Sequence, residues 1–377
     1  MNRPNNINSP KRKTFLTKLE HNKKAIGLTI LLALAGGYAL HELTEKETFK
    51  AKVETPASLK GRKINDLYSY YMGFSGKRET LGDSINFNPE EIIHQLYEKK
   101  LKNNHRNDFV VAQKFYDEVI KKIDFNTVDP SDIDTYLSHI EKAIDEVKDN
   151  FNWEKFGKDK FQSNTNKTSL FKHICKNIDE ESLLSYSMTE LFPGTEGIFN
   201  KEFLSFILEH GGEKFLQYLP AIYDDYTSFG PYQFTYLALA DYGKTKNGAS
   251  QTNIYLPEHY RIPGSVNQLK GDQHHKAAYL FAMYNIAQLV KRNDIPQGAL
   301  SMISKGKYKN DLAELIAIMH NKPGKGADFL KEWYRLQNNQ TYDKNKNGKV
   351  DIYEAYPGSK IASQYGKKTY HNKNAIN

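Results

Sequence analysis

The sequence predicts a mainly α-helical protein. Strict alternation of apolar and polar residues, the pattern of a half-buried strand, is almost absent from its 377 residues. Apolar residues instead recur at three- and four-residue spacing, behind an Asn or Ser in a capping position, in stretches such as NPEEIIHQLYEKKLKN, DFVVAQKFYDEVIKKI and PSDIDTYLSHIEKAIDEVKDNF. A chain of this length can bury a large core and form more than one folded unit.

Positive charge is concentrated at the N-terminus. Residues 1–24 contain seven Lys and Arg residues and a single acidic residue, so they carry most of the net charge of +8. The rest of the chain is nearly neutral and lacks the basic excess with which proteins bind a phosphate backbone. We therefore expect residues 1–24 to be a basic cytoplasmic tail, and we expect no nucleic-acid partner.

An uncharged run of 16 residues, AIGLTILLALAGGYAL, follows this tail. As a helix it would extend about 24 Å, and flanking residues can lengthen it toward the thickness of a bilayer. We expect residues 25–41 to be a transmembrane signal anchor, with the C-terminal body on the extracytoplasmic side of the cell membrane by the positive-inside rule. A cleaved signal peptide and a buried core helix are the alternatives.

Composition divides the part of the chain after this anchor. Residues 42–60 are charged and lack apolar periodicity, which predicts a linker. Residues 61–160 are expected to form a helical region of unknown role, and the polar stretch KFQSNTNKTS predicts a boundary near residues 160–169. The single Cys175 excludes an intramolecular disulfide and is expected to be a small buried hydrophobic residue.

The stretch DEESLLSYSMTELFPGTEG, Asp179 to Gly197, predicts a helix that begins at an Asp N-cap and ends before Pro193. Glu190 then lies in its last turn, beside Leu191. Partial desolvation and the negative end of the helix would both raise the pKa of Glu190. A carboxyl that stays protonated near neutral pH can protonate a glycosidic oxygen. The alternative is an exposed Glu at a helix end.

The stretch DDYTSFGPYQFT, Asp224 to Thr235, combines carboxylates, a small-residue turn, aromatic rings and one amide. Gly230 would let the backbone approach a ligand, Tyr232 or Phe229 could pack on a sugar ring, and Gln233 could donate to and accept from an N-acetyl group or a hydroxyl. The alternative is an ordinary tight turn before a helix over FTYLALADYG.

These two stretches, followed by MHNKPGKG at the end of an apolar helix, resemble the lysozyme-like superfamily, specifically lytic transglycosylases and goose-type lysozymes. The family pattern is a helix that ends in the catalytic Glu, a G-x-x-Q loop along the sugar cleft, and a later Tyr-Asn-x-Gly-Pro-Gly-like turn. Here the loop is Gly230-Pro231-Tyr232-Gln233. The resemblance covers about residues 170–338 and implies a lysozyme-like catalytic domain there.

The chain departs from this pattern at several positions. Leu191 replaces the usual Ser after the Glu, Pro231-Tyr232 replaces Leu-Met, and His320 stands where Tyr is common. The interval from Glu190 to the loop is about twice the usual one, so FNKEFLSFILEHGGEKFLQYLPAIY would be an inserted helical segment. Under a shifted alignment, Glu209 or Glu213 becomes the competing acid.

The resemblance implies cleavage of β-1,4 linkages in a peptidoglycan-like glycan, with Glu190 as general acid and base. Asp224 could position a water for an inverting reaction, although two adjacent acids such as Asp224 and Asp225 before a turn are more often solvated loop residues or a cap. Lytic transglycosylases need no second carboxylate, because the C6 hydroxyl of the sugar attacks. The substrate would contact Ser228, Gly230, Tyr232, Gln233, His320 and Asn321.

Two alternative functions without catalysis are consistent with the sequence. A calcium-stabilised envelope module could bind glycan or a partner protein through the same groove, or the chain could be an anchored helical scaffold. The sequence identifies no protein partner. His274-His275 begin an amphipathic helix; neighbours in sequence do not share a helix face, so paired zinc ligation is not expected, and helix-start polarity accounts for them.

The stretch DKNKNGKVDIYE has the spacing of an EF-hand calcium loop within residues 339–358. Gly348 occupies the turn position, and Val350 is the expected apolar residue. Oxygen ligands to Ca²⁺ would come from Asp343, Asn345, Asn347, Lys349 (through its carbonyl), Asp351 and Glu354. Pro357 shortens the exiting segment, so we expect the loop to pin the C-terminus rather than to act as a sensor. Residues 359–377 are expected to be a flexible polar tail.

Overall fold

The computed structural model describes residues 89–103, 109–125, 129–191, 197–220, 228–235, 248–264, 268–321, 323–338 and 362–376. The predicted mainly α-helical class is confirmed over these residues, where the only sheet is a two-stranded hairpin, β1 (Ser228–Phe229) and β2 (Phe234–Thr235). The α-helices are α3 (Pro89–Asn103), α4 (Phe109–Glu118), α5 (Ile133–Asn150), α6 (Trp153–Phe161), α7 (Thr165–Lys176), α8 (Glu180–Leu191), α9 (Ile198–Tyr218), α11 (Ser250–Asn253), α12 (Gln273–Lys291), α13 (Gln297–Ile303), α14 (Lys309–Asn321), α15 (Pro323–Gln337) and α17 (Ala362–Ile376).

Side-chain caps fix where several of these helices begin. The side chains of Asp132, Asn152, Asn164 and Asp179 each accept a hydrogen bond from the backbone N–H three residues later. Each bond satisfies one of the amides left without a partner in the first turn of a helix. The predicted Asp cap of α8 is therefore confirmed, whereas α5 is capped by Asp132 and not by the preceding Ser131.

Residues 87–377 form one compact unit. The predicted boundary near residues 160–169 falls inside it, at the short turn between α6 and α7. Phe156 of α6 stacks on Phe171 of α7 with the ring centroids 4.7 Å apart, and α7 packs on α12. The polar composition of this connection reflects a surface turn capped by Asn164, not a separation between folded units.

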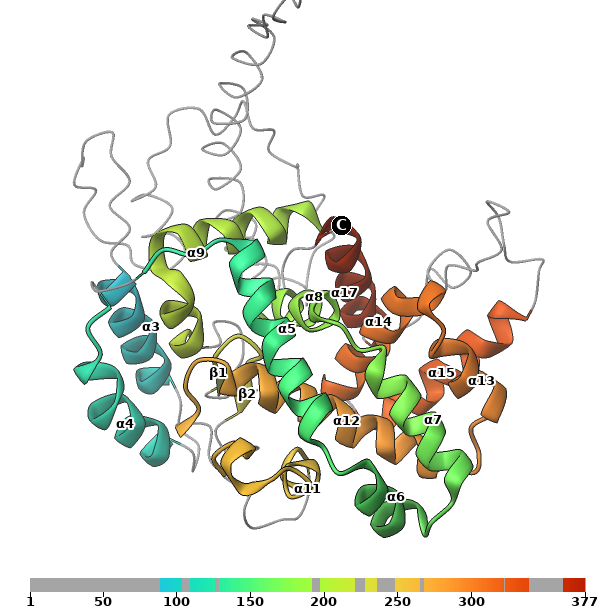
Figure 1. Ribbon diagram of the computed structural model, residues 1–377. Coiled ribbons are helices and arrows are strands. Elements are labelled where there is room, and N and C mark those ends of the chain that lie inside the picture. Colours follow the sequence, from blue (N-terminus) through green and yellow to red (C-terminus); the bar gives the residue numbers. More distant parts are fainter. Residues whose placement is uncertain are drawn as a thin grey trace, which may run out of the picture. The chain divides into compact units, whose positions relative to one another are not determined.

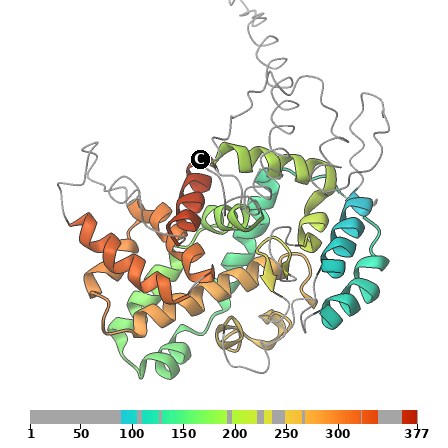
Figure 2. The ribbon, with the colours of Figure 1, turned by 180° about the vertical axis from the view of Figure 1, so that it is seen from behind.

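Helix α8 lies in the interior of this unit and packs against α5, α9, α12, α14 and α17 (Figures 1 and 2). Every side chain from Ser182 to Thr189 is buried. Four of these eight residues are Ser or Thr, which are small enough to admit neighbouring helices on all sides. Their hydroxyl groups must find partners in the interior, and this requirement governs how the neighbours dock.

Helix α9 bends at Gly212, whose φ of 62° is outside the helical range (Figure 1). A left-handed backbone angle favours glycine, so the Gly211-Gly212 pair accounts for the break. The second half of α9 leads to Pro220, which forms a bridge with Phe229 of β1. The bend thus delivers the end of α9 to the hairpin.

The C-terminus differs from expectation. Ala362–Ile376, within the predicted flexible tail, form helix α17, which packs on α14, α8 and α9. Figure 1 shows α17 beside α8 and α14. Its buried residues include Thr369, Asn372 and Lys373, which are polar. A hydropathy pattern does not identify such a helix, because its packing face is made by hydrogen-bonded polar side chains.

Several predictions concern residues outside the described ranges. These are the basic tail, the anchor at 25–41, the linker at 42–60 and the calcium loop at 339–358. Among the described helices, none combines the length and apolar character needed to cross a membrane.

Candidate functional site

The last turn of α8 carries Glu190, as predicted. The residue is half-buried and its Oε1 atom is shielded from solvent. The turn before it is held in the core by Met188, with no exposed surface, and by the Thr189 hydroxyl, which donates to the Ser185 carbonyl at 2.9 Å. Glu190 therefore lies at the edge of the core, at a helix end that these contacts fix.

The G-x-x-Q segment forms the turn of the β1–β2 hairpin. Ser228 pairs with Thr235 and Phe229 pairs with Phe234 across the four-residue turn Gly230 to Gln233. Gly230 has a φ of 80°, and a Cβ at this position would lie 3.0 Å from His274 Nδ1 and 3.2 Å from the Gln217 carbonyl. Only glycine suits both the backbone angle and the space, so the loop is built around Gly230.

Gln233 uses its amide inside the hairpin. Its Nε2 group donates to the Gly230 carbonyl at 2.7 Å and to the Leu219 carbonyl at 3.1 Å, and Oε1 accepts from the Ser228 hydroxyl at 3.4 Å. Both Gln233 and Ser228 are buried. The expectation that these side chains contact a sugar is therefore not supported in this conformation, because the amide fastens the turn to the end of α9.

Tyr232 and Phe229 are also inside the protein, with 0% and 1% of their surface exposed. The Tyr232 hydroxyl is hydrogen-bonded to His275 Nδ1 at 2.9 Å, and Phe229 stacks on Phe115 of α4 at 4.6 Å. The predicted packing of these rings on a pyranose face would require them to leave the core. They instead hold the hairpin in place.

The hairpin lies directly against α8. The Ser187 hydroxyl donates to the Pro231 carbonyl at 2.7 Å, and the Tyr186 hydroxyl donates to the Tyr232 carbonyl at 3.3 Å. The rings of Tyr186 and Tyr232 stack with centroids 5.4 Å apart. Two of the three motifs that carry the resemblance are thus in contact, through residues three and four positions before Glu190.

His320, near the end of α14, brings the third motif to the same place. Its ring lies 4.8 Å from Tyr186 of α8, 5.3 Å from Phe234 of β2 and 5.0 Å from Phe281 of α12. Although part of His320 reaches the surface, this aromatic enclosure desolvates the imidazole and lowers its pKa to about 3. His320 is therefore neutral near pH 7. Asn321 is the last residue of α14.

His274 and His275 are core residues, contrary to the expectation of helix-start polarity. They are 1% and 3% exposed. Burial lowers the pKa of His274 to about 4 and that of His275 to about 3, so both imidazoles are neutral near pH 7. His274 packs against Gly230 and His275 bonds to Tyr232, so these two residues of α12 fix the hairpin turn. Sequence periodicity missed this role because it depends on a loop some forty residues away.

The two competing acids differ in their surroundings. Glu209 is exposed. Glu213 is half-buried and bonded to α5: it lies 2.9 Å from His139 Nδ1 and accepts from the Ser131 hydroxyl at 3.2 Å. Glu213 therefore joins α9 to the start of α5, a structural task the sequence did not indicate.

The remaining candidates cannot be placed. Asp224 and the six proposed calcium ligands (Asp343, Asn345, Asn347, Lys349, Asp351 and Glu354) lie outside the described ranges. Over the residues that are described, no group of three or more His, Cys, Asp or Glu side chains is arranged to hold a metal ion.

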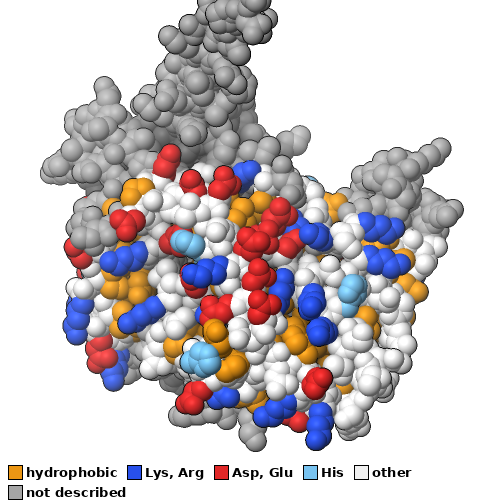
Figure 3. Space-filling model, in the orientation of Figure 1, with side chains coloured by type: hydrophobic (Ala, Val, Ile, Leu, Met, Phe, Trp, Pro, Cys, Tyr) orange, Lys and Arg blue, Asp and Glu red, His pale blue; other side chains and the backbone are white. Residues whose placement is uncertain are grey.

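The face shown in Figure 3 carries a band of acidic side chains over α5. Its exposed acids include Asp134, Glu141, Asp145 and Asp149.

No protein-family model, curated protein or solved structure matches this chain.

Proposed function

We propose that this chain cleaves β-1,4 linkages in a peptidoglycan-like amino-sugar polymer, with Glu190 as general acid and then base. The observation that supports the proposal most is that α8, the hairpin turn and His320 lie together. Ser187 and Tyr186 of α8 bond to the Pro231 and Tyr232 carbonyls, and the ring of Tyr186 also faces His320. The end of α8, the hairpin turn and His320 thus meet around the helix turn that precedes Glu190, although His320 follows Glu190 by 130 residues.

The setting of Glu190 suits acid catalysis. The residue sits at the end of a buried helix, and one carboxyl oxygen is shielded from water. General acids in glycosidases are carboxyl groups kept partly out of solvent on rigid supports. In the proposed reaction Glu190 gives its proton to the glycosidic oxygen as the bond from this oxygen to C1 breaks.

The two possible mechanisms, transglycosylation and hydrolysis, differ in the group that attacks C1. In a transglycosylase, the Glu190 carboxylate takes the proton of the C6 hydroxyl as that oxygen bonds to C1, which leaves an anhydro end. In an inverting hydrolase, a water positioned by Asp224 attacks C1. The resemblance favours the first mechanism, and the second requires Asp224 to approach the sugar from the opposite face.

In this proposal the hairpin residues shape the site rather than hold the sugar by their side chains. Gln233 fastens the turn to α9, Tyr232 anchors it to α12, and Gly230 permits its close packing on His274. The anchor at 25–41 would hold the enzyme at the membrane with its body facing the cell wall, and the loop Asp343 to Glu354 would bind Ca²⁺ near the C-terminus.

The test is digestion of purified peptidoglycan by the full-length protein in detergent, with calcium present and products identified by mass. The proposal predicts muropeptides with anhydro ends from the native protein and none from Glu190→Gln. Hydrated reducing ends would move the mechanism to hydrolysis and give Asp224 a role. If the folded native protein binds the glycan and releases no product, the protein is a non-catalytic binding module and the proposal is wrong.

A further inference from the structure

The C-terminal helix α17 meets α8 through side chains that are buried and polar. Thr369 and Asn372 have no exposed surface, and Lys373 is 1% exposed. In both ribbon views α17 lies alongside α8 and α14 (Figures 1 and 2). The contacts fall at both ends of α8, which is the helix that carries Glu190.

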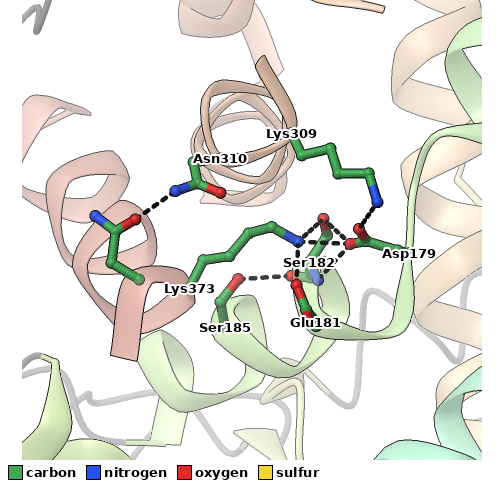
Figure 4. Close-up of polar contacts among 8 residues, drawn as sticks. Asp179, Glu181, Ser182, Ser185, Lys309, Asn310 and Lys373 are labelled. Atoms are coloured by element: carbon green, nitrogen blue, oxygen red, sulfur yellow. Dashed lines mark hydrogen bonds and ion pairs between the residues drawn. The ribbon is translucent and has the colours of Figure 1, made fainter. Parts of the chain in front are cut away.

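At the first turn of α8 the contact is ionic. Lys373 Nζ donates to Asp179 Oδ1 at 2.6 Å and to the Ser182 hydroxyl at 3.1 Å, and it lies 3.3 Å from Glu181 Oε2 (Figure 4). Lys309 of α14 pairs with the other oxygen of Asp179 at 3.1 Å. These contacts fix the first turn of α8, at the opposite end of the helix from Glu190.

At the last turn of α8 the contact is made by hydroxyl and amide groups. The single hydroxyl proton of Thr189 is donated to the Ser185 carbonyl. Its oxygen must therefore accept the bond from the Thr369 hydroxyl at 2.8 Å, and it also accepts from Asn372 Nδ2 at 3.0 Å. Both bonds that the Thr189 hydroxyl oxygen accepts here thus come from α17, and Thr189 is the residue before Glu190.

Asn372 also reaches the start of α9. Its Oδ1 atom accepts from the Gly197 amide at 2.7 Å and from Asn200 Nδ2 at 3.1 Å. Gly197 is the N-cap residue of α9. The Asn372 side chain of α17 therefore connects the last turn of α8, which carries Glu190, to the N-cap of α9, the next helix in the chain.

Buried polar contacts of this kind specify a geometry as much as they add stability, because a displaced partner leaves an unsatisfied group in the interior. A general acid depends on such geometry, since a displacement of about 1 Å costs on the order of 100-fold in rate. We infer that Thr369 and Asn372 are positioning residues for Glu190, which act by fixing the last turn of α8. The catalytic half of this inference rests on the proposed function.

The test compares Thr369→Val with Thr369→Ser, which restores the hydroxyl, and with Lys367→Ala, an exposed position on α17. Steady-state cleavage is measured at a temperature at which every variant is fully folded. We expect Thr369→Val to lose about 10- to 100-fold in kcat with little change in KM, and both other variants to keep the native rate. An unchanged kcat in an active Thr369→Val enzyme would overturn the inference.

A second measurement does not depend on activity. Amide hydrogen exchange across residues 186–191 should accelerate in Thr369→Val and stay native in Lys367→Ala. If the native protein cleaves no glycan, faster local exchange in Thr369→Val still establishes that α17 holds the end of α8, and only the proposed function fails. Exchange at 186–191 that does not change would refute the positioning role in either case.

Discussion

At the scale of single residues, the contacts that place Glu190 are local and those that place Gln233 come from another element. Glu190 was placed in the last turn of a helix from an Asp cap and a Pro-Gly stop, both within a dozen residues, and α8 carries it there. Gln233 was expected to face a ligand, but its amide bonds to the Leu219 carbonyl, fourteen residues earlier. No local pattern indicates the position of that carbonyl, so the orientation of the side chain could not be predicted.

Replacement of Gln233 by Ala tests this assignment. The buried carbonyl groups of Gly230 and Leu219 would each lose the Nε2 donor and keep one backbone donor, and the loss of these two hydrogen bonds should cost about 1–3 kcal/mol in the free energy of unfolding. Ser228→Ala is the matched control, because it removes only the longer bond of 3.4 Å to the same side chain. The measurement is urea unfolding, and a Gln233→Ala protein as stable as the native one would show that the amide does not fasten the hairpin.

At the scale of elements, α8 illustrates how a cap can also be an ion-pair partner. Asp179 accepts from the Ser182 amide at the start of the helix and pairs with Lys373 and Lys309. Burial alone would raise the pKa of Asp179, but Lys373, together with the hydrogen bonds to Lys373, Ser182 and Lys309, outweighs it and lowers the pKa to about 2. The cap was predictable from the sequence; the lysines come from α14 and α17 and were not.

The stabilisation from this lowered pKa should depend on pH. Because the pKa falls from 3.8 to about 2 on folding, the charged Asp179 contributes fully above pH 3.8 and loses its contribution as the pH falls toward 2. The difference in unfolding free energy between the native protein and Asp179→Asn should therefore be about 2 kcal/mol near neutral pH and shrink below pH 4. Asn retains the capping oxygen, so the comparison isolates the charge.

The same pH series with Asp179→Ala separates the cap from the charge. Asp179→Ala should lose about 1 kcal/mol more than Asp179→Asn at every pH, because the cap is then lost as well. A native-minus-variant difference that stays constant from pH 6 to pH 2 would contradict the assignment of the low pKa to Asp179.

At the scale of the whole molecule, the helical class and the positions of α3, α4, α5 and α12 followed from apolar periodicity. The single compact unit of residues 87–377 did not, because a polar connection such as residues 162–164 looks the same between domains as within one. Helix α17 was missed for a related reason: its buried face is Thr, Asn and Lys. The meeting of α8, the hairpin and α14 was suggested only by resemblance.

Three desolvated imidazoles should make the whole fold sensitive to mild acid. Burial lowers the pKa of His320 and His275 from 6.5 to about 3, and that of His274 to about 4. The unfolded chain binds protons at these groups below pH 6.5 while the folded chain does not, so stability is retained above pH 6.5 and declines as the pH falls below it.

His320→Phe preserves the aromatic packing and removes one of these groups, so thermal unfolding temperature should fall less steeply between pH 6.5 and pH 4 than in the native protein. A slope in His320→Phe identical to the native one would mean that His320 is protonated in the folded state.

The central claim is that Glu190 is the acid that acts on the glycan. The measurement that tests it most directly is the cleavage rate on purified peptidoglycan for Glu190→Gln, beside the same change at the competing acids Glu209 and Glu213, with glycan binding measured for each. Loss of a general acid should reduce the rate by on the order of 100- to 10,000-fold without loss of binding, and Glu209→Gln should be as fast as the native protein. A Glu190→Gln protein that cleaves at the native rate, or a loss confined to Glu213→Gln, would contradict the account.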